Sequence, residues 1–167
     1  MPQSRARRRR RPASQDISAF KQLLTTKRRG ELSELAFAHK AASEGFGVAK
    51  PYGDSEPFDF ILISHGWPEG DKLWRVQVKS TATLKDGFYH INTHRYGPKG
   101  VIAYTPREID FLIAHIVPDD SWFIFPIGVL VDRRSLSLRP KNSTRPGVFE
   151  GLRDFWDRLR PPKKKKT

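Results

Sequence analysis

The fold is decided by two stretches, Pro-Phe-Asp-Phe-Ile-Leu-Ile at residues 57–63 and Leu-Trp-Arg-Val-Gln-Val-Lys at residues 73–79. Both stretches are rich in β-branched and aromatic residues, which favour strands. The polar segment 64–71 between them contains two glycines and Pro68, which is typical of a turn. The two stretches are therefore predicted to form a β-hairpin.

The second strand of this hairpin carries an unusual row of polar side chains. Successive side chains point to opposite faces of a strand, so Arg75, Gln77, Lys79 and Thr81 share one face, while two valines occupy the other. On the first strand, Asp59 is the only charged residue between positions 57 and 63, among residues that favour burial. A lone carboxylate in such surroundings needs a polar or charged partner.

Hydrophobic periodicity and turn residues predict the elements outside the hairpin. A helix is expected over residues 26–44, where an apolar stripe runs through Leu32, Leu35 and His39, and Gly45 ends the run. The other expected elements are a short helix at 17–24, strands at 48–49 and 88–92, a loop at 96–100, a hairpin of 111–117 with 122–125, and a helix after Pro146 with apolar residues at 149, 152, 156 and 159.

This order of elements predicts an α+β fold, in which a mixed β-sheet is flanked by helices. The expected organisation is one domain over residues 15–160 between two disordered basic tails, at 1–14 and 161–167. Six arginines lie in residues 1–12, and one arginine and four lysines lie in residues 160–167. The rest of the chain holds 20 basic and 18 acidic residues, although the whole chain has a net charge of +13. Such tails either attract polyanions or simply keep the protein in solution.

The composition excludes several classes of protein. There is no cysteine, so disulfides, thiolate nucleophiles and cysteine-ligated metals are excluded. The longest apolar run, residues 122–131, contains Pro126 and Gly128 and is far shorter than the roughly 20 residues that a membrane-spanning helix needs. We therefore expect a soluble protein with no membrane partner and no small-molecule cofactor, and the cytoplasm is the default location.

Hydrolysis of a phosphodiester gives the polar face of the hairpin a chemical purpose. The reaction needs a divalent ion held by oxygen ligands, which polarises the phosphate and activates water, and a cation that stabilises the developing charge. Asp59, the amide oxygen of Gln77 and the backbone carbonyl of Val78 are candidate ligands. Lys79 is a candidate to orient the attacking water and to stabilise charge.

The order of these residues resembles the PD-(D/E)XK nucleases, whose pattern is a helix glutamate, an aspartate opening one strand, and an acid or Gln two places before a Lys on the next strand. Here the pattern reads Glu34, Asp59, Gln77 and Lys79. The Gln-x-Lys variant and the intervening Pro-Tyr-Gly-Asp at 51–54 look like the branch that contains the group I intron homing endonucleases and bacterial relatives. The resemblance covers roughly residues 26–126 and includes Tyr104, Asp110, Trp122 and Pro126.

The resemblance implies a restriction-endonuclease-like core and a metal-dependent DNA endonuclease of the bacterial cytoplasm that uses Mg²⁺, with Mn²⁺ as a substitute. Asp59 would be the principal metal ligand, Glu34 would support the metal from the helix, Gln77 would be a weaker ligand and Lys79 the catalytic lysine. A neutral Gln77 lowers the negative charge that holds the ion. Cleavage of both strands of a duplex requires two such sites, so a homo-oligomer is expected.

The position of Glu34 is less clear from periodicity than from the resemblance. Helical spacing places Glu34 beside Ala38 and Ala41 and away from the expected apolar stripe, so periodicity alone leaves it exposed. Small alanines can let a carboxylate reach toward a sheet, and Glu31 is the alternative candidate.

Four basic residues are candidates for contacts with DNA: Arg75, Lys85, Arg95 and Lys99. Basic residues with interleaved aromatic residues suit nucleic acids, although scattered surface charge would produce the same set. The segment 128–144 is a candidate for an added element that sets specificity.

Two alternatives from other functional classes remain. The first is a nucleic-acid-binding module that keeps the scaffold but has lost catalysis, for which the neutral Gln77 is the argument. The second is a basic-tailed RNA-associated or ribosome-associated protein, for which the tails are the only argument. Each residue taken alone also has a structural reading, because an aspartate at a strand start can hydrogen-bond a turn and a Gln-x-Lys strand can be an ordinary edge.

Overall fold

The computed structural model describes residues 25–98 and 100–162, and the description below applies to them. The expected tail at 1–14, the short helix at 17–24, Lys99 and the lysine run 163–166 lie outside these residues. The elements in chain order, with η for a 3₁₀ turn, are α2 (Thr26–Ser43), β1 (Gly47–Ala49), β2 (Phe60–Ser64), β3 (Lys72–Thr81), β4 (Leu84–Lys85), β5 (Phe88–Asn92), β6 (His94–Gly97), β7 (Gly100–Ala103), β8 (Phe111–Ile116), η1 (Val117–Asp119), β9 (Ser121–Pro126), η2 (Ile127–Leu130), β10 (Ser135–Leu138), η3 (Glu150–Leu152) and η4 (Trp156–Leu159).

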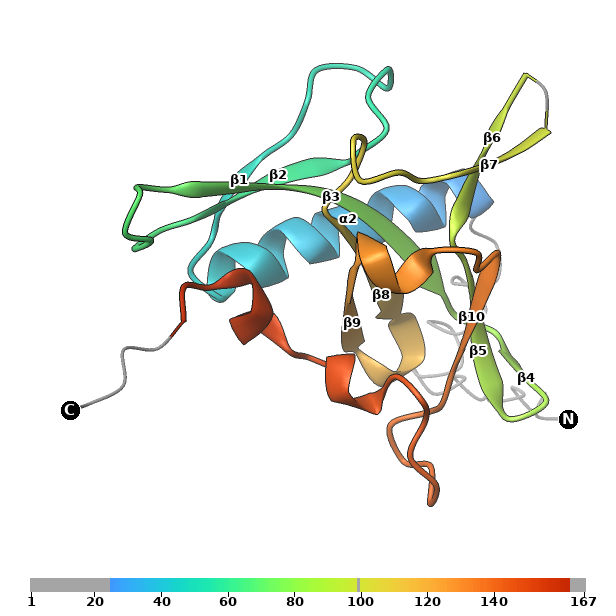
Figure 1. Cartoon of the computed structure of the whole chain (residues 1–167). Helices are drawn as coiled ribbons and strands as arrows, with labels where there is room; N and C mark the ends of the chain where they lie inside the picture. Colours follow the sequence, from blue (N-terminus) through green and yellow to red (C-terminus); the bar gives the residue numbers. More distant parts are fainter. Residues whose placement is uncertain (1–24, 99, 163–167) are drawn as a thin grey trace, which may run out of the picture.

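A five-stranded mixed sheet forms the centre of the molecule, in the order β1-β2-β3-β8-β9 (Figure 1). The β2–β3 pair is the expected antiparallel hairpin, with Phe60 opposite Val76. β3 then pairs in parallel with β8, and β8 pairs with β9 in the second expected hairpin. The sequence prediction of an α+β fold with a mixed sheet is thus confirmed for the described residues.

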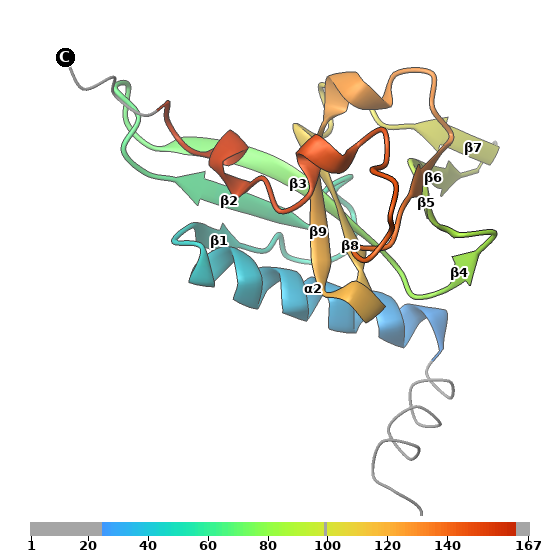
Figure 2. The same ribbon diagram turned by 90° about the horizontal axis from the view of Figure 1, so that it is seen from below.

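The central sheet is covered on both faces, so every residue of β8 is buried, including His115. α2 lies along one face (Figure 2), and its Phe37 packs into a cluster with Phe60 and Val76. The opposite face carries a second cluster, in which Leu112 packs with Leu136 of the small sheet β10-β5-β4. Gln77 and Lys79 on β3, and Asp59 directly before β2, are therefore positioned by strands that are packed on both sides.

The expected loop at 96–100 is partly wrong, because Tyr96 and Gly97 lie in β6 and Gly100 lies in β7. β6 and β7 pair antiparallel, with Arg95 opposite Ile102, and form a separate two-stranded ribbon (Figure 1). The segment 128–144 also contains a strand, because β10 pairs with β5 and places Ser135 opposite Asn92.

The prediction of a helix after Pro146 is wrong. The segment forms two short 3₁₀ turns instead, and Asp154 between them has a φ of 49°, in the left-handed region that ends a helix. Asp154 is held there because its backbone N–H donates to the carbonyl of Trp122 and its carboxylate accepts from the N–H of Trp122 at 3.0 Å. Of the helices expected to flank the sheet, the described residues therefore contain α2 alone as an α-helix.

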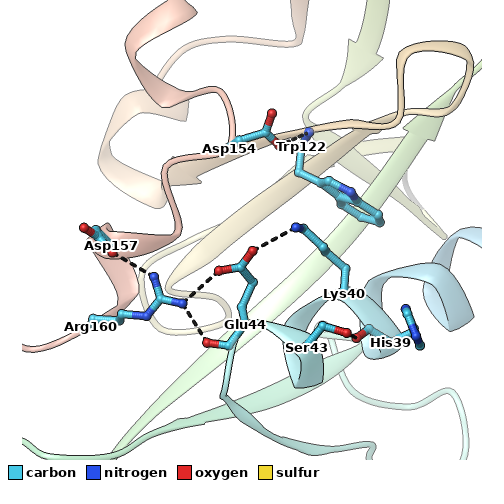
Figure 3. A network of polar contacts seen from close by, with 8 residues as sticks. All are labelled: His39, Lys40, Ser43, Glu44, Trp122, Asp154, Asp157 and Arg160. Carbon is cyan, nitrogen blue, oxygen red and sulfur yellow. Dashed lines mark hydrogen bonds and ion pairs between the residues drawn. The ribbon is translucent and has the colours of Figure 1, made fainter.

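Arg160 fastens the C-terminal segment to the end of α2 (Figure 3). Its guanidinium donates to the backbone carbonyl of Glu44 at 2.6 Å, to the Glu44 carboxylate at 2.9 Å and to Asp157 at 2.7 Å. Lys40 donates to the same Glu44 carboxylate at 2.8 Å, so two cations hold this one acid. No helix among the described residues is both long and apolar enough to cross a membrane.

Candidate active site

Asp59 is the centre of the polar cluster on the hairpin. It directly precedes β2, and its carboxylate accepts hydrogen bonds from the Val78 backbone N–H at 2.7 Å and from the Gln77 amide. Burial raises the pKa of Asp59, and the charge of Glu34 raises it further, whereas the Val78 hydrogen bond and the charge of Lys79 lower it. The carboxylate is thus desolvated and needs a cation.

Gln77 is buried, with 8% of its surface exposed, and lies against Asp59 as the alternation of side chains predicts. Its amide nitrogen donates to Asp59 and, at 3.3 Å, to the carbonyl of Val78. This orientation differs from the one expected for a metal ligand. The amide oxygen can serve as a ligand only after the amide group rotates by half a turn.

Lys79 follows on the same strand and reaches the same cluster. Burial lowers the pKa of Lys79, while the charges of Asp59 and Glu34 raise it. Its ammonium lies 5.6 Å from the centre of the Tyr104 ring. A partly desolvated ammonium next to two carboxylates is suited to stabilise charge that develops on a phosphate.

Glu34 lies on the side of α2 that faces the sheet, where periodicity did not place it. The expected stripe is exposed, with Leu35 at 65%, whereas Ser33 and Phe37 are buried. Phe37 decides the rotation of the helix, because its ring packs 5.1 Å from the ring of Phe60 in the core. Glu34 lies one turn before Phe37 on the same side of the helix, close enough for its charge to act on Asp59 and Lys79.

Lys50 also belongs to the cluster, although the sequence analysis did not single it out. Its ammonium donates to the Glu34 carboxylate at 2.7 Å, and the charges of Asp59 and Asp54 act on it as well. The only sequence signal for Lys50 is its place directly before the Pro-Tyr-Gly-Asp segment at 51–54.

Tyr104, noted above only through the family resemblance, closes the cluster from the chain that follows β7. Burial raises the pKa of its hydroxyl, and the negative charge of Asp59 raises it further. The phenol therefore stays protonated and can donate a hydrogen bond into the site.

Two of the residues expected to contact DNA, Arg75 and Arg95, are paired with acidic residues of the protein. Arg75 donates to both carboxylate oxygens of Asp110 and to the carbonyls of Pro106 and Arg107, so it fastens β3 to the turn before β8. Arg95 is paired with Glu108.

Lys85 lies exposed on β4, and Lys99 lies outside the described residues. Arg75 and Arg95 are paired with acidic residues of the protein, at Asp110 and Glu108. Of the three described candidates for DNA contact, Lys85 is the exposed one.

The donor set fits a magnesium ion. Within residues 25–98 and 100–162, no cluster contains three or more histidine or acidic ligands. The site instead offers the carboxylates of Asp59 and Glu34 and the carbonyl of Val78 as oxygen donors, and the amide oxygen of Gln77 can join them once the amide rotates. Mg²⁺ prefers oxygen and is commonly bound by only one or two carboxylates together with substrate phosphates.

Comparison with known proteins connects this chain to an enzyme family. Residues 24–148 match the family model of the PD-(D/E)XK endonucleases, which is three quarters of the chain. No curated protein gives a significant match.

Two solved structures are similar. The structure of the bacterial homing endonuclease I-Ssp6803I is 26% identical and superposes with a TM-score of 0.68, and the match covers 81% of this chain and 93% of that chain. The crystal structure of MepB is 14% identical with a TM-score of 0.35, over 71% of this chain and 87% of that chain, which is too distant to bear on function.

Proposed function

This chain belongs to the PD-(D/E)XK endonuclease family, and from this premise we propose that it is a Mg²⁺-dependent endonuclease that hydrolyses phosphodiester bonds of DNA. The observation that carries the proposal is the set of mutual interactions around Asp59: Gln77 donates to it, and the charges of Glu34 and Lys79 act on it. An acid from a helix, an acid from one strand and a Gln-x-Lys pair from the next meet at one place.

Asp59 and Glu34 would hold the ion, with the amide of Gln77 and the carbonyl of Val78 as further ligands. Bound there, Mg²⁺ supplies polarisation of the scissile phosphate and activation of water. The oxygen of water would form a new bond to phosphorus while one P–O bond of the DNA backbone breaks. Water would give up a proton, the leaving oxygen would take up a proton, and the products would be a phosphate monoester end and a free hydroxyl end.

Lys79 and Tyr104 assist from the protein side. The ammonium of Lys79, desolvated by burial, stabilises negative charge on the phosphate oxygens and orients the attacking water. The protonated hydroxyl of Tyr104 supplies a neutral donor beside it.

The second candidate function is a nucleic-acid-binding module without catalysis. One observation favours it: the amide nitrogen of Gln77, rather than its oxygen, faces Asp59. If the amide cannot rotate, the site keeps two carboxylates and one carbonyl as ligands.

Cleavage of supercoiled plasmid with Mg²⁺ or Mn²⁺ separates the two functions. We expect wild type to nick the plasmid and Asp59→Ala and Lys79→Ala each to lose at least about 100-fold in rate, because each removes a group that acts on the transition state. Chelation of the metal should stop the reaction.

Two matched variants control for loss of charge. Asp71→Ala removes an exposed carboxylate that pairs with His65, and Lys72→Ala removes a lysine that packs on Trp67. Both should cleave at the wild-type rate. Equal cleavage by wild type, Asp59→Ala and Lys79→Ala indicates a contaminating nuclease, and metal-independent DNA binding without cleavage by any of them favours the binding module.

The similarity to a homing endonuclease supports a proposal for the class of substrate. We propose duplex DNA, and cleavage of both strands would require two sites, so a homo-oligomer is part of the proposal. Light scattering of the full chain in the presence and absence of DNA tests it, and a single copy on a doubly cleaved duplex contradicts it.

A further inference from the structure

An ammonium group already occupies one of the two carboxylates of the candidate metal site. Lys50 Nζ lies 2.7 Å from Glu34 Oε2, which is a close ion pair. The pair joins α2 to the segment that follows β1, sixteen residues apart along the chain. The side chain of Lys50 is 57% exposed and that of Glu34 is 27% exposed, so the lysine is the more solvent-accessible partner of the pair.

The position of Lys50 involves the whole site and not Glu34 alone. The negative charges of Asp59 and Asp54 also act on Lys50, and its ammonium lies 5.6 Å from the centre of the Phe60 ring. The charge of Lys79 also acts on Asp59 and Glu34, so two lysines balance the two carboxylates that would bind a metal.

We propose that Lys50 is the resident counter-ion of the metal site and competes directly with a divalent metal for Glu34. The inference rests on the proposed function, in which Glu34 and Asp59 hold that metal. One carboxylate oxygen of Glu34 accepts a hydrogen bond from the ammonium of Lys50. A metal that uses this oxygen must therefore displace the ammonium first.

Displacement of Lys50 has a functional consequence. An ammonium on a long and mostly exposed side chain can move to solvent or to a phosphate at small cost, whereas the Asp59 carboxylate is held by hydrogen bonds from Val78 and Gln77. Metal binding to the protein alone is therefore weakened. DNA supplies phosphate oxygens for the metal and a new partner for Lys50, so it strengthens metal binding.

Binding of Mn²⁺ to the full chain without DNA, measured by calorimetry, tests the competition. We expect Lys50→Met to bind Mn²⁺ about 3- to 10-fold more tightly than wild type, because the competing cation of a partly exposed ion pair is removed. Lys50→Arg keeps the charge and should bind no more tightly than wild type.

The matched control is Lys40→Met. Lys40 forms an ion pair of similar length with Glu44, at 2.8 Å, in the network of Figure 3 and outside the candidate site. This variant loses the same charge from the same chain, and its affinity for Mn²⁺ should equal that of wild type.

A double-mutant cycle separates direct competition from a general field effect. In the Glu34→Gln background, Lys50 no longer faces a carboxylate at that position, so adding Lys50→Met should change the Mn²⁺ affinity by less than about 2-fold. A gain that persists undiminished in this background overturns direct competition for Glu34.

The other outcomes are equally decisive. An affinity of Lys50→Met equal to or weaker than wild type overturns the proposal, and so does the absence of Mn²⁺ binding by both chains. Neither result depends on cleavage, which is measured separately with DNA, so failure of this inference can be distinguished from failure of the proposed nuclease function.

Discussion

The carboxylate of Asp59 accepts hydrogen bonds from Val78 and Gln77, yet burial still raises its pKa. The carboxylate that would bind a cation therefore lowers the free energy of unfolding of the protein. A desolvated carboxylate beside a second acid costs free energy that a neutral residue of the same shape would not cost.

We therefore expect Asp59→Asn to stabilise the protein by about 0.5–2 kcal/mol at pH 7 while it abolishes cleavage. A folded-state pKa above the ordinary 3.8 means that the folded protein holds the Asp59 proton more tightly than the unfolded chain. The wild type consequently loses stability as pH rises through the folded-state pKa, and Asn does not titrate. The advantage of the variant should shrink as pH falls toward 3.8.

Urea denaturation of both proteins at several pH values measures this difference. Asp71→Asn, at an exposed carboxylate, is the control and should stay within about 0.5 kcal/mol of wild type. A variant less stable than wild type at pH 7, or an advantage that grows on acidification, contradicts the assignment of Asp59 as a strained carboxylate.

Among the elements, the C-terminal segment contributes to the core although it lies beyond the residues that match the family model, 24–148. Trp156 and Leu159 are buried against Phe37 of α2. The segment is not an α-helix, yet it completes the cluster that orients α2, and with it Glu34.

Neighbouring aromatic residues of this segment give a matched comparison. Trp156 is 3% exposed and Phe155 is 43% exposed. We expect Trp156→Ala to lower the free energy of unfolding by about 3–5 kcal/mol through cavity formation, and Phe155→Ala to lower it by less than about 1 kcal/mol. Thermal and urea denaturation measure both values, and similar losses in the two variants contradict the burial of Trp156 in the core.

At the scale of the whole molecule, charge and chemistry are separated along the chain. Residues 1–12 and 163–166 hold ten of the 31 basic residues, whereas the candidate active site lies within the nearly neutral body. Nonspecific attraction to DNA phosphates and cleavage should therefore depend on different parts of the chain.

Deletion of residues 1–12 and 163–167 tests this separation. The deletion must leave Arg160 in place, because Arg160 fastens the C-terminal segment to Glu44. We expect weaker DNA binding and retained cleavage at low salt. The slope of log K against log salt should become shallower by up to about 0.9 for each phosphate that the tails no longer neutralise. The change is measured by titration at several salt concentrations.

A chain with scrambled tails of the same composition is the control and should bind DNA as wild type does. Loss of metal-dependent cleavage at low salt in the truncated but folded chain would contradict a self-sufficient nuclease body. Two results together would favour the basic-tailed RNA-associated protein: the truncated chain no longer binds nucleic acid, and the wild type does not cleave DNA.

Local signals in the sequence were sufficient for the elements that carry the candidate site. The two runs of β-branched and aromatic residues with turn residues between them predicted the β2–β3 hairpin, and the turn after 117 predicted the β8–β9 hairpin. Alternation assigned Gln77 to the polar face of its strand, and the register of the hairpin places it beside Asp59. Their roles in catalysis stay predictions.

Tertiary structure alone decided the features that depend on distant partners. The parallel pairing of β3 with β8 joins segments more than thirty residues apart, and the packing of Phe37 against Phe60 turned Glu34 toward the sheet against the apparent periodicity. The pairing of Lys50 with Glu34 has no local signal at all. By itself the sequence determined the strands of the two central hairpins and which residues of β3 share a face, because these depend on neighbours along the chain, whereas β4, β6, β7 and β10 were not predicted. The rotation of α2, the C-terminal 3₁₀ turns and the counter-ion of the site were decided by which distant side chains could be buried or paired together.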